Sequence, residues 1–215
     1  MRKEKRLYLY SGMLFILLFA LWTFLVRSID AKAIGPLDSM VGFSMLNRYV
    51  HEALGVNMRL YTVTDWLGLV PIAIALGFAV LGLIQLLKRK SLIRVDRDIL
   101  ILGGFYLCVM AVYVTFEYVI INYRPVLIDG YLEASYPSST TTLVMCIIPT
   151  TIFQLKYRLK SNAIRHFITA LLYGFMLFMV IGRLLSGVHW ITDIIGGALI
   201  SAGLVLIYAS LCLTK

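Results

Sequence analysis

Long apolar segments constrain this chain more than any other feature of its sequence. A helix needs about 20 apolar residues to cross a lipid bilayer, and six segments reach or approach that length. Inside lipid, backbone amide groups must find partners within their own segment, so helices are the expected form. The six predicted spans are residues 7–26, 66–87, 98–121, 139–155, 166–185 and 189–213.

The composition agrees with a membrane protein. The chain is 60% hydrophobic and only 14% charged, whereas a soluble domain is about 45–50% apolar and about a quarter charged. Neither an internal repeat nor a low-complexity linker divides the sequence. We therefore expect an all-α, polytopic membrane protein with six transmembrane helices, formed by a single domain over residues 1–215.

The first apolar segment follows the basic stretch MRKEKR, an arrangement that also begins secretory signal peptides. Its apolar run of about 20 residues exceeds the 7–15 residues typical of a signal peptide, and no A-x-A cleavage site is evident near its end. We expect a retained anchor helix.

Lysine and arginine residues predict the orientation in the membrane. If the chain starts inside, fourteen of these residues fall in inner segments and six in outer ones. The positive-inside rule then places both termini in the cytoplasm of a multi-pass plasma-membrane protein. The net charge of +9 is explained by this topology and by contact with anionic lipid, not by a nucleic-acid partner. Residues 28–65, 122–138 and 186–188 then share the outer face.

The long outer segment contains a second helical pattern. Between residues 36 and 55, apolar residues recur at helical spacing, which predicts an amphipathic helix lying on the outer membrane surface after the first span. Such a helix either packs on the protein or acts as a lid that guides a substrate. The apolar positions are 37, 40, 41, 45, 46, 49, 50, 53 and 54.

The three cysteines, Cys108, Cys146 and Cys212, all lie in apolar runs and form no CxxC pattern. Neither a disulfide framework nor a zinc site is expected from this spacing. The sequence offers no metal cluster, indicates no cofactor and carries no signal for an oligomeric state.

The stretch GRLLSGVHWITD, residues 182–193, places three polar side chains between two apolar segments. His189 and Asp193 are four residues apart, so we expect them on one face of the last helix, with the carboxylate accepting one imidazole N–H. The other ring nitrogen then presents a lone pair. Arg183 can return across a turn that Gly187 permits, and a guanidinium beside a histidine suits a phosphate group. The alternative is a buried Arg–Asp pair with an incidental histidine.

Two more stretches fall on the same outer face. In YPSST, Pro137 ends the preceding segment and Ser138 or Ser139 can cap the fourth helix, whose free N–H groups form an anion site. Arg124, followed by Pro125, adds a second cation. Taken singly, these residues are an ordinary cap and an ordinary interfacial arginine. Their convergence on one face favours an anion-binding site.

In this order the three stretches resemble the motifs of the type 2 phosphatidic acid phosphatase superfamily, a family of integral membrane lipid phosphatases. Its motifs are K-x6-R-P, P-S-G-H and S-R-x5-H-x3-D, and here they correspond to EYVIINYRP (117–125), PSST (137–140) and GRLLSGVHWITD (182–193). The resemblance spans roughly residues 66–213, with the core motifs in 117–193. It implies a six-helix membrane hydrolase that acts on a membrane lipid and requires no metal.

The resemblance also implies residue roles. His189 would be the nucleophile that forms a phosphohistidine, and Asp193 would orient it. The phosphate oxygens would be held by Arg124, Ser138, Ser139, Thr140 and Arg183.

Four positions depart from the family pattern. Glu117 replaces lysine, Ser139 replaces glycine and Gly182 replaces serine. Thr140 replaces the histidine that protonates the leaving oxygen, and a threonine hydroxyl is far too weak an acid for that task. General acid catalysis typically contributes about 10²–10⁴-fold, so this replacement affects the expected activity.

Three interpretations of Thr140 remain open. Activity is reduced, or another group such as Glu117, His51 or Glu52 supplies the proton, or the substrate needs little acid assistance. The third favours lipid diphosphates such as a polyprenyl (for example undecaprenyl) diphosphate, because phosphate is a better leaving group than a lipid alkoxide. The competing hypotheses are a relative that binds lipid phosphates without efficient turnover, a transporter-like or partner-binding membrane protein, and a structural scaffold.

Overall fold

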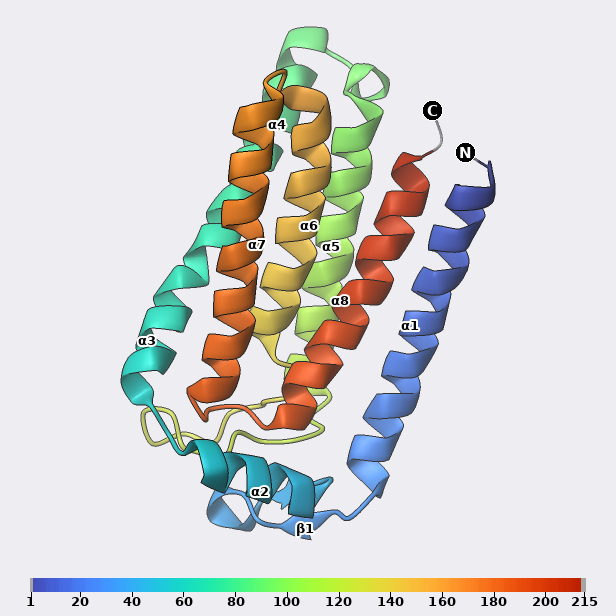
Figure 1. Ribbon diagram of the computed structural model, residues 1–215. Coiled ribbons are helices and arrows are strands. Elements are labelled where there is room, and N and C mark those ends of the chain that lie inside the picture. The colour runs from blue at the N-terminus through green and yellow to red at the C-terminus, as the bar shows by residue number, and fades with distance from the viewer. Residues whose placement is uncertain (1, 214–215) are drawn as a thin grey trace.

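The computed structural model describes residues 2–213, so Lys215, one of the predicted inner cations, lies outside the described residues. Helices dominate the fold, and long ones run alongside one another (Figure 1). The helices are α1 (Arg2–Ser28), α2 (Ser44–Leu54), α3 (Met58–Leu67), α4 (Leu69–Arg89), α5 (Arg97–Tyr118), α6 (Ser139–Arg158), α7 (Asn162–Leu185) and α8 (Ile191–Cys212). Short elements complete the order: strands β1 (Lys32–Ala33) and β2 (Met40–Val41), and the 3₁₀ turns η1 (Pro36–Asp38) and η2 (Leu92–Arg94).

Helices occupy all six segments predicted to cross the membrane, and the all-α class is confirmed. Among the described residues, five stretches are long and apolar enough to span a bilayer: α1 from Lys3, α3 with α4, α5, α7 and α8. The second stretch begins at Met58, because α3 extends it into the segment 28–65 that was predicted to lie outside. The position of residues 58–65 relative to the membrane stays a prediction. The count of six spans stays a prediction, since α6 is not among the five.

Helix α6 differs from its neighbours because protein surrounds it. It contacts α4, α5, α7 and α8, and more than half of its residues are buried. Side chains that face protein can be polar if they find hydrogen bonds, and the hydroxyls of Thr150 and Thr151 donate to carbonyl oxygens one turn earlier in α6. This environment explains why α6 is less apolar than the outer helices.

Helices α1 and α8, the first and last of the chain, pack closely along each other (Figure 1). A Cβ added at Gly12 would lie 2.7 Å from Ile207, and one at Gly203 would lie 2.7 Å from Ile16. Small residues let two helices approach in a membrane, where van der Waals contact replaces the hydrophobic effect as the driving force. The Trp22 indole N–H also donates to the Thr192 carbonyl at 3.1 Å.

One end of the bundle is covered by α2, the β1–β2 hairpin and the loop that joins α5 to α6 (Figure 1). The predicted helix within 36–55 is present but begins at Ser44, because residues 32–41 form the hairpin and η1 instead. Asn47 in α2 is buried and donates to Thr192 Oγ1 at 3.0 Å, which attaches α2 to the start of α8. Met45 and Tyr49 are exposed.

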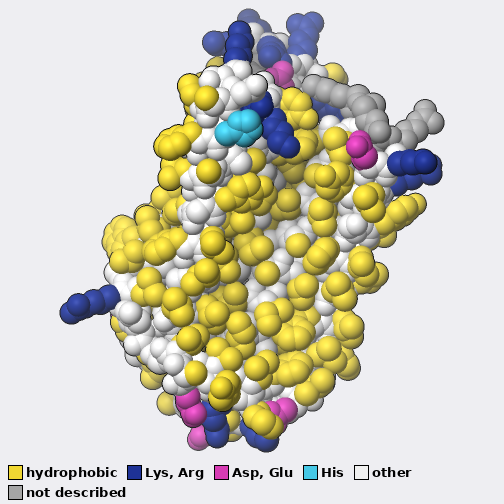
Figure 2. Space-filling model, in the orientation of Figure 1, with side chains coloured by type: hydrophobic (Ala, Val, Ile, Leu, Met, Phe, Trp, Pro, Cys, Tyr) yellow, Lys and Arg dark blue, Asp and Glu magenta, His cyan; other side chains and the backbone are white. Residues whose placement is uncertain are grey.

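The opposite end is basic. Figure 2 shows hydrophobic side chains over the middle of one face, and Lys and Arg side chains gathered at the end where α1 begins. A half-buried ion pair joins α5 and α6 there: Arg158 donates to Asp98 Oδ2 at 3.0 Å through both terminal nitrogens.

Candidate active site

His189 and Asp193 meet through a third residue. The Ser135 hydroxyl lies 3.1 Å from His189 Nδ1 and donates a short hydrogen bond to Asp193 Oδ2. His189 Nδ1 itself is 3.8 Å from Asp193 Oδ2. The direct hydrogen bond predicted for this pair is therefore wrong, because His189 precedes α8 and does not share a helical turn with Asp193.

Asp193 is held at the N-terminus of α8 by backbone and side-chain donors. Its Oδ2 accepts the Trp190 N–H at 2.9 Å, and its Oδ1 accepts the Asn122 amide at 3.2 Å. Its carbonyl accepts the Ser138 N–H at 3.0 Å, which joins α8 to the start of α6. A carboxylate at a helix N-terminus is stabilised by the free N–H groups there.

His189 keeps one nitrogen free. The residue is 3% exposed, and Nε2 has no hydrogen-bond partner in the protein. Burial is the first cause that holds the pKa of His189 well below its usual range, followed by the positive charges of Arg124 and Arg183. The imidazole is therefore neutral at physiological pH, and a neutral imidazole can attack an electrophile.

Two arginines of the site contact the same aromatic ring, that of Tyr61. The Arg183 guanidinium carbon lies 5.0 Å from the centre of the Tyr61 ring and that of Arg124 lies 5.9 Å from it. Each guanidinium also forms an ion pair with a carboxylate. Arg183 Nη2 lies 3.3 Å from Asp65 Oδ1. Arg124 Nε lies 3.0 Å from Glu133 Oε2, but the angle does not allow a hydrogen bond. Arg183 Nε and Arg124 Nη1 have no hydrogen-bond partner.

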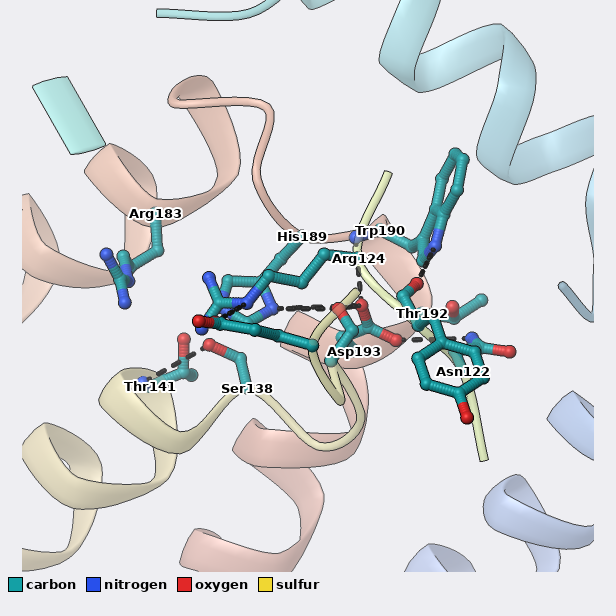
Figure 3. Close-up of polar contacts among 12 residues, drawn as sticks. Asn122, Arg124, Ser138, Thr141, Arg183, His189, Trp190, Thr192 and Asp193 are labelled. Atoms are coloured by element: carbon teal, nitrogen blue, oxygen red, sulfur yellow. Dashed lines mark hydrogen bonds and ion pairs between the residues drawn. The ribbon is translucent and has the colours of Figure 1, made fainter. Parts of the chain in front are cut away.

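The start of α6 completes the group. Ser138 is buried and caps the helix by accepting the Thr141 N–H at 3.5 Å, as the sequence predicted. The Thr141 hydroxyl is buried without a partner. In Figure 3, Arg183, Arg124 and His189, which come from three separate segments, are drawn beside Ser138 and Thr141 at the start of α6. Unpaired donors gathered around one space suit an anion with several oxygens.

Ser139 and Thr140 contribute to a neighbouring feature. They line a groove of about 1210 Å³ that runs between α4 and α5. Most of its lining residues are apolar, and those on the α4 side extend from Leu69 to Leu86. Arg124, Ser135, Glu133 and Asp65 lie at its polar end. The groove therefore leads from the apolar part of the bundle to Arg124 and Ser135.

The turn between Arg183 and His189 depends on Gly187, as predicted. Its φ of +68° lies in the left-handed region, and an added Cβ would sit 2.1 Å from the Gly55 carbonyl oxygen. The Asn57 N–H donates to the Ser186 carbonyl at 3.0 Å, so the connection between α2 and α3 supports this turn. The turn fixes the separation of the arginine and the histidine.

Sequence reasoning missed Ser135, Asn122, Tyr61 and Thr141. Ser135 and Asn122 are small polar residues close to predicted motif residues, and nothing in their spacing indicates that they contact Asp193. Tyr61 was placed in the outer segment. In the described part of the chain, no group of three or more His, Cys, Asp or Glu side chains is arranged to hold a metal ion.

Comparisons with known proteins agree with the motifs. The sequence profile of the PAP2 superfamily matches residues 122–214. The crystal structure of a transmembrane PAP2-type phosphatidylglycerolphosphate phosphatase from Bacillus subtilis superposes with a TM-score of 0.53 over 94% of both chains, at 19% identity, a similarity that shows the fold. No curated protein matches the chain in sequence. The predicted resemblance is thereby confirmed: the chain resembles the PAP2 superfamily over residues 122–214 and shares the fold of a PAP2-type membrane phosphatase.

Proposed function

We propose that this protein is an integral membrane enzyme that hydrolyses lipid phosphates or diphosphates through a phosphohistidine intermediate on His189. The observation that carries the proposal is the buried, unpartnered Nε2 of His189 beside the free donors of Arg124 and Arg183. The PAP2 superfamily match supports a membrane phosphatase, and the apolar groove beside the site supports a lipid substrate.

The reaction proceeds in two displacements. The Nε2 lone pair attacks phosphorus, the bond to the leaving oxygen breaks, and that oxygen keeps the electron pair. A water oxygen then attacks phosphorus, and the P–N bond breaks with its electrons returning to Nε2. Both hydrogens of the water leave with the inorganic phosphate, as H2PO4⁻ or, after loss of one proton to solvent, as HPO4²⁻. Arg124, Arg183, Ser138, Ser139 and Thr140 hold the phosphoryl oxygens, and charge neutralisation of this kind is usually a large contribution to catalysis.

Thr140 directs the choice of substrate. A lipid alkoxide leaving from a phosphomonoester needs a proton, whereas a lipid monophosphate leaving from a diphosphate does not. We therefore favour a polyprenyl diphosphate, such as undecaprenyl diphosphate, over phosphatidic acid. Of the earlier alternative acids, Glu117 is the best placed, because it lines the groove. His51, which packs on Trp190 at 5.3 Å between ring centres, and Glu52 are not among the lining residues.

In the membrane, we place both termini in the cytoplasm of a plasma-membrane protein and the active site on the outer side. The sixth span is α6, which its neighbours shield from lipid. Helix α2 lies on the outer membrane surface, a position supported by its exposed Met45 and Tyr49. The basic end of the bundle supports this orientation through the positive-inside rule.

A second candidate is a relative that binds lipid phosphates without efficient turnover. It is favoured by Thr140, and by the pairing of the carboxylates of Glu133 and Asp65 with the site arginines, which leaves them unsuited as acids.

The experiment that separates the two candidates measures phosphate release from purified protein in detergent micelles. Farnesyl diphosphate and a phosphatidate are offered side by side to wild type and to His189→Ala. We expect release from the diphosphate to exceed that from the phosphatidate, and His189→Ala to abolish both while the variant stays folded. Binding of both lipids without release would favour the second candidate, and release by His189→Ala equal to that of wild type would contradict the phosphohistidine.

A further inference from the structure

We propose that Ser135 is a positioning residue that joins the imidazole of His189 to the carboxylate of Asp193, so that the nucleophile is oriented by a His–Ser–Asp chain. The inference deepens the proposed function, because it assigns the group that presents Nε2 to phosphorus. It rests on contacts made by the loop before α6, a segment remote in sequence from His189.

The hydrogen bonds of Ser135 fix their own direction. A serine hydroxyl has a single hydrogen and two lone pairs. The hydrogen goes to Asp193 Oδ2, because a carboxylate can only accept hydrogen bonds. The same carboxylate also accepts the Trp190 N–H and the Asn122 amide. The Ser135 oxygen is then left to accept the N–H of His189 Nδ1, 3.1 Å away. A hydrogen on Nδ1 leaves Nε2 unprotonated.

No other described group can do this for His189. Asp193 Oδ2 is 3.8 Å from Nδ1, beyond hydrogen-bond distance, and Asp193 cannot swing closer without losing its bonds to Trp190 and Asn122. Ser135 is itself 2% exposed, so bulk water does not compete for its hydroxyl. Its neighbour Tyr136 is held by a 2.7 Å hydrogen bond between its hydroxyl and Thr23 of α1, which fixes the loop.

The chain of hydrogen bonds also stabilises the covalent intermediate. When Nε2 bonds to phosphorus, the ring becomes positively charged and keeps its Nδ1 hydrogen. That hydrogen points at Ser135, whose dipole is aligned by the negative charge of Asp193. No proton moves along the chain, and the charge is neutralised again when the P–N bond breaks. An orienting partner of this kind matters because the wrong tautomer of the nucleophile cannot react.

The first test compares Ser135→Ala, which removes the hydroxyl, with Ser135→Thr, which retains it. Ser210→Ala is the control, since Ser210 is also a buried serine but bonds only within α8, to the Ile207 carbonyl. With farnesyl diphosphate in micelles, we expect Ser135→Ala to lower kcat roughly 100-fold with KM within a few-fold. Ser135→Thr should recover part of the loss, and Ser210→Ala should match wild type. A kcat of Ser135→Ala equal to that of wild type would overturn the inference.

A double variant tests whether Ser135 acts through Asp193. If both belong to one chain, Ser135→Ala combined with Asp193→Ala should be about as slow as Asp193→Ala alone, because units that act together are not additive. Losses that multiply would mean that Ser135 acts independently of Asp193, and the inference would fail.

The tautomer of His189 gives a readout that does not need turnover. Nitrogen-15 NMR of histidine-labelled protein, with the His189 signal assigned by its loss in His189→Ala, should show the hydrogen on Nδ1 in wild type and a shift toward Nε2 in Ser135→Ala. A hydrogen on Nε2 in wild type would refute the inference. If wild type releases no phosphate from either lipid, the proposed function fails, while the tautomer still decides the role of Ser135.

Discussion

His189 Nδ1 and Asp193 Oδ2 lie 3.8 Å apart, close enough to attract each other but too far to share a hydrogen. The separation follows from the position of Trp190 at the N-cap of α8, where Asp193 bonds back to the Trp190 N–H. Asp193 thus serves two purposes, as the cap of α8 and as the negative charge behind the histidine.

Replacing Asp193 by asparagine separates these two purposes. The amide oxygen still caps the helix, whereas the negative charge is lost. We expect Asp193→Asn to lower kcat by about 100-fold or more while the melting temperature changes by only a few degrees. Asp98→Asn, at the opposite end of the bundle, is the matched control and should change stability without lowering kcat. Equal kcat values for the two variants would contradict the role of Asp193.

Restoring a histidine at position 140 tests the substrate preference. Thr140→His should raise phosphate release from a phosphatidate about tenfold or more, since general acid catalysis contributes about 10²–10⁴-fold when the acid is well placed. The gain with farnesyl diphosphate should be smaller, because its leaving group needs no proton. Thr140→Asn is the matched control, because it places a polar side chain without an acidic proton at the same position. Equal gains on both lipids would argue against the preference for diphosphates.

The pH profile should reflect the buried state of His189. Its pKa is held below the ordinary value of 6.5, so the imidazole stays neutral as pH falls through 6.5 and protonates only at lower pH. We expect kcat/KM to show no loss from His189 between about pH 8 and about pH 6. In Arg124→Gln, which removes a nearby positive charge, the acid limb should move to higher pH. The substrate's own titration is measured by phosphorus NMR in the same micelles, and an acid limb of wild type at pH 6.5 or above after this correction would speak against a lowered pKa.

The turn at Gly187 should tolerate no side chain. Gly187→Ala should weaken lipid binding and lower kcat/KM about tenfold or more, because the new Cβ meets the Gly55 oxygen and displaces His189 relative to Arg183. Gly130→Ala is matched in backbone conformation, since Gly130 also has a positive φ of +83° but has open space around its Cβ position. If both variants lose activity alike, the contact with Gly55 is not the cause.

The α1–α8 contact should depend on small residues. Gly203→Leu should lower the melting temperature in detergent by several degrees, because the side chain must displace Ile16. Gly174→Leu places the same side chain on α7, where nothing lies within 4 Å of the Cβ position, and should leave the melting temperature nearly unchanged. A similar loss in both variants would show that leucine at an exposed position is sufficient to destabilise the bundle.

Sequence patterns predicted the helices well because a membrane helix must satisfy its own backbone, which leaves a long apolar signal. The apolar signal for α6 was weaker, because a helix that other helices shield from lipid need not be apolar. The site was reached through ordered motifs, and the convergence of Arg124, Arg183 and His189 agrees with that prediction. Ser135 could not be assigned, because its role depends on the register of one loop against another, and register leaves no periodic trace in a sequence.

Helix α1 lies outside residues 122–214, yet Trp22 and Thr23 bond to Thr192 and Tyr136 beside the site. These bonds cross from α1 to the N-terminus of α8 and to the loop before α6, so a fragment cut down to residues 122–214 would keep the motifs but lose the support that α1 gives them. The matched segment is therefore not a self-contained structural unit.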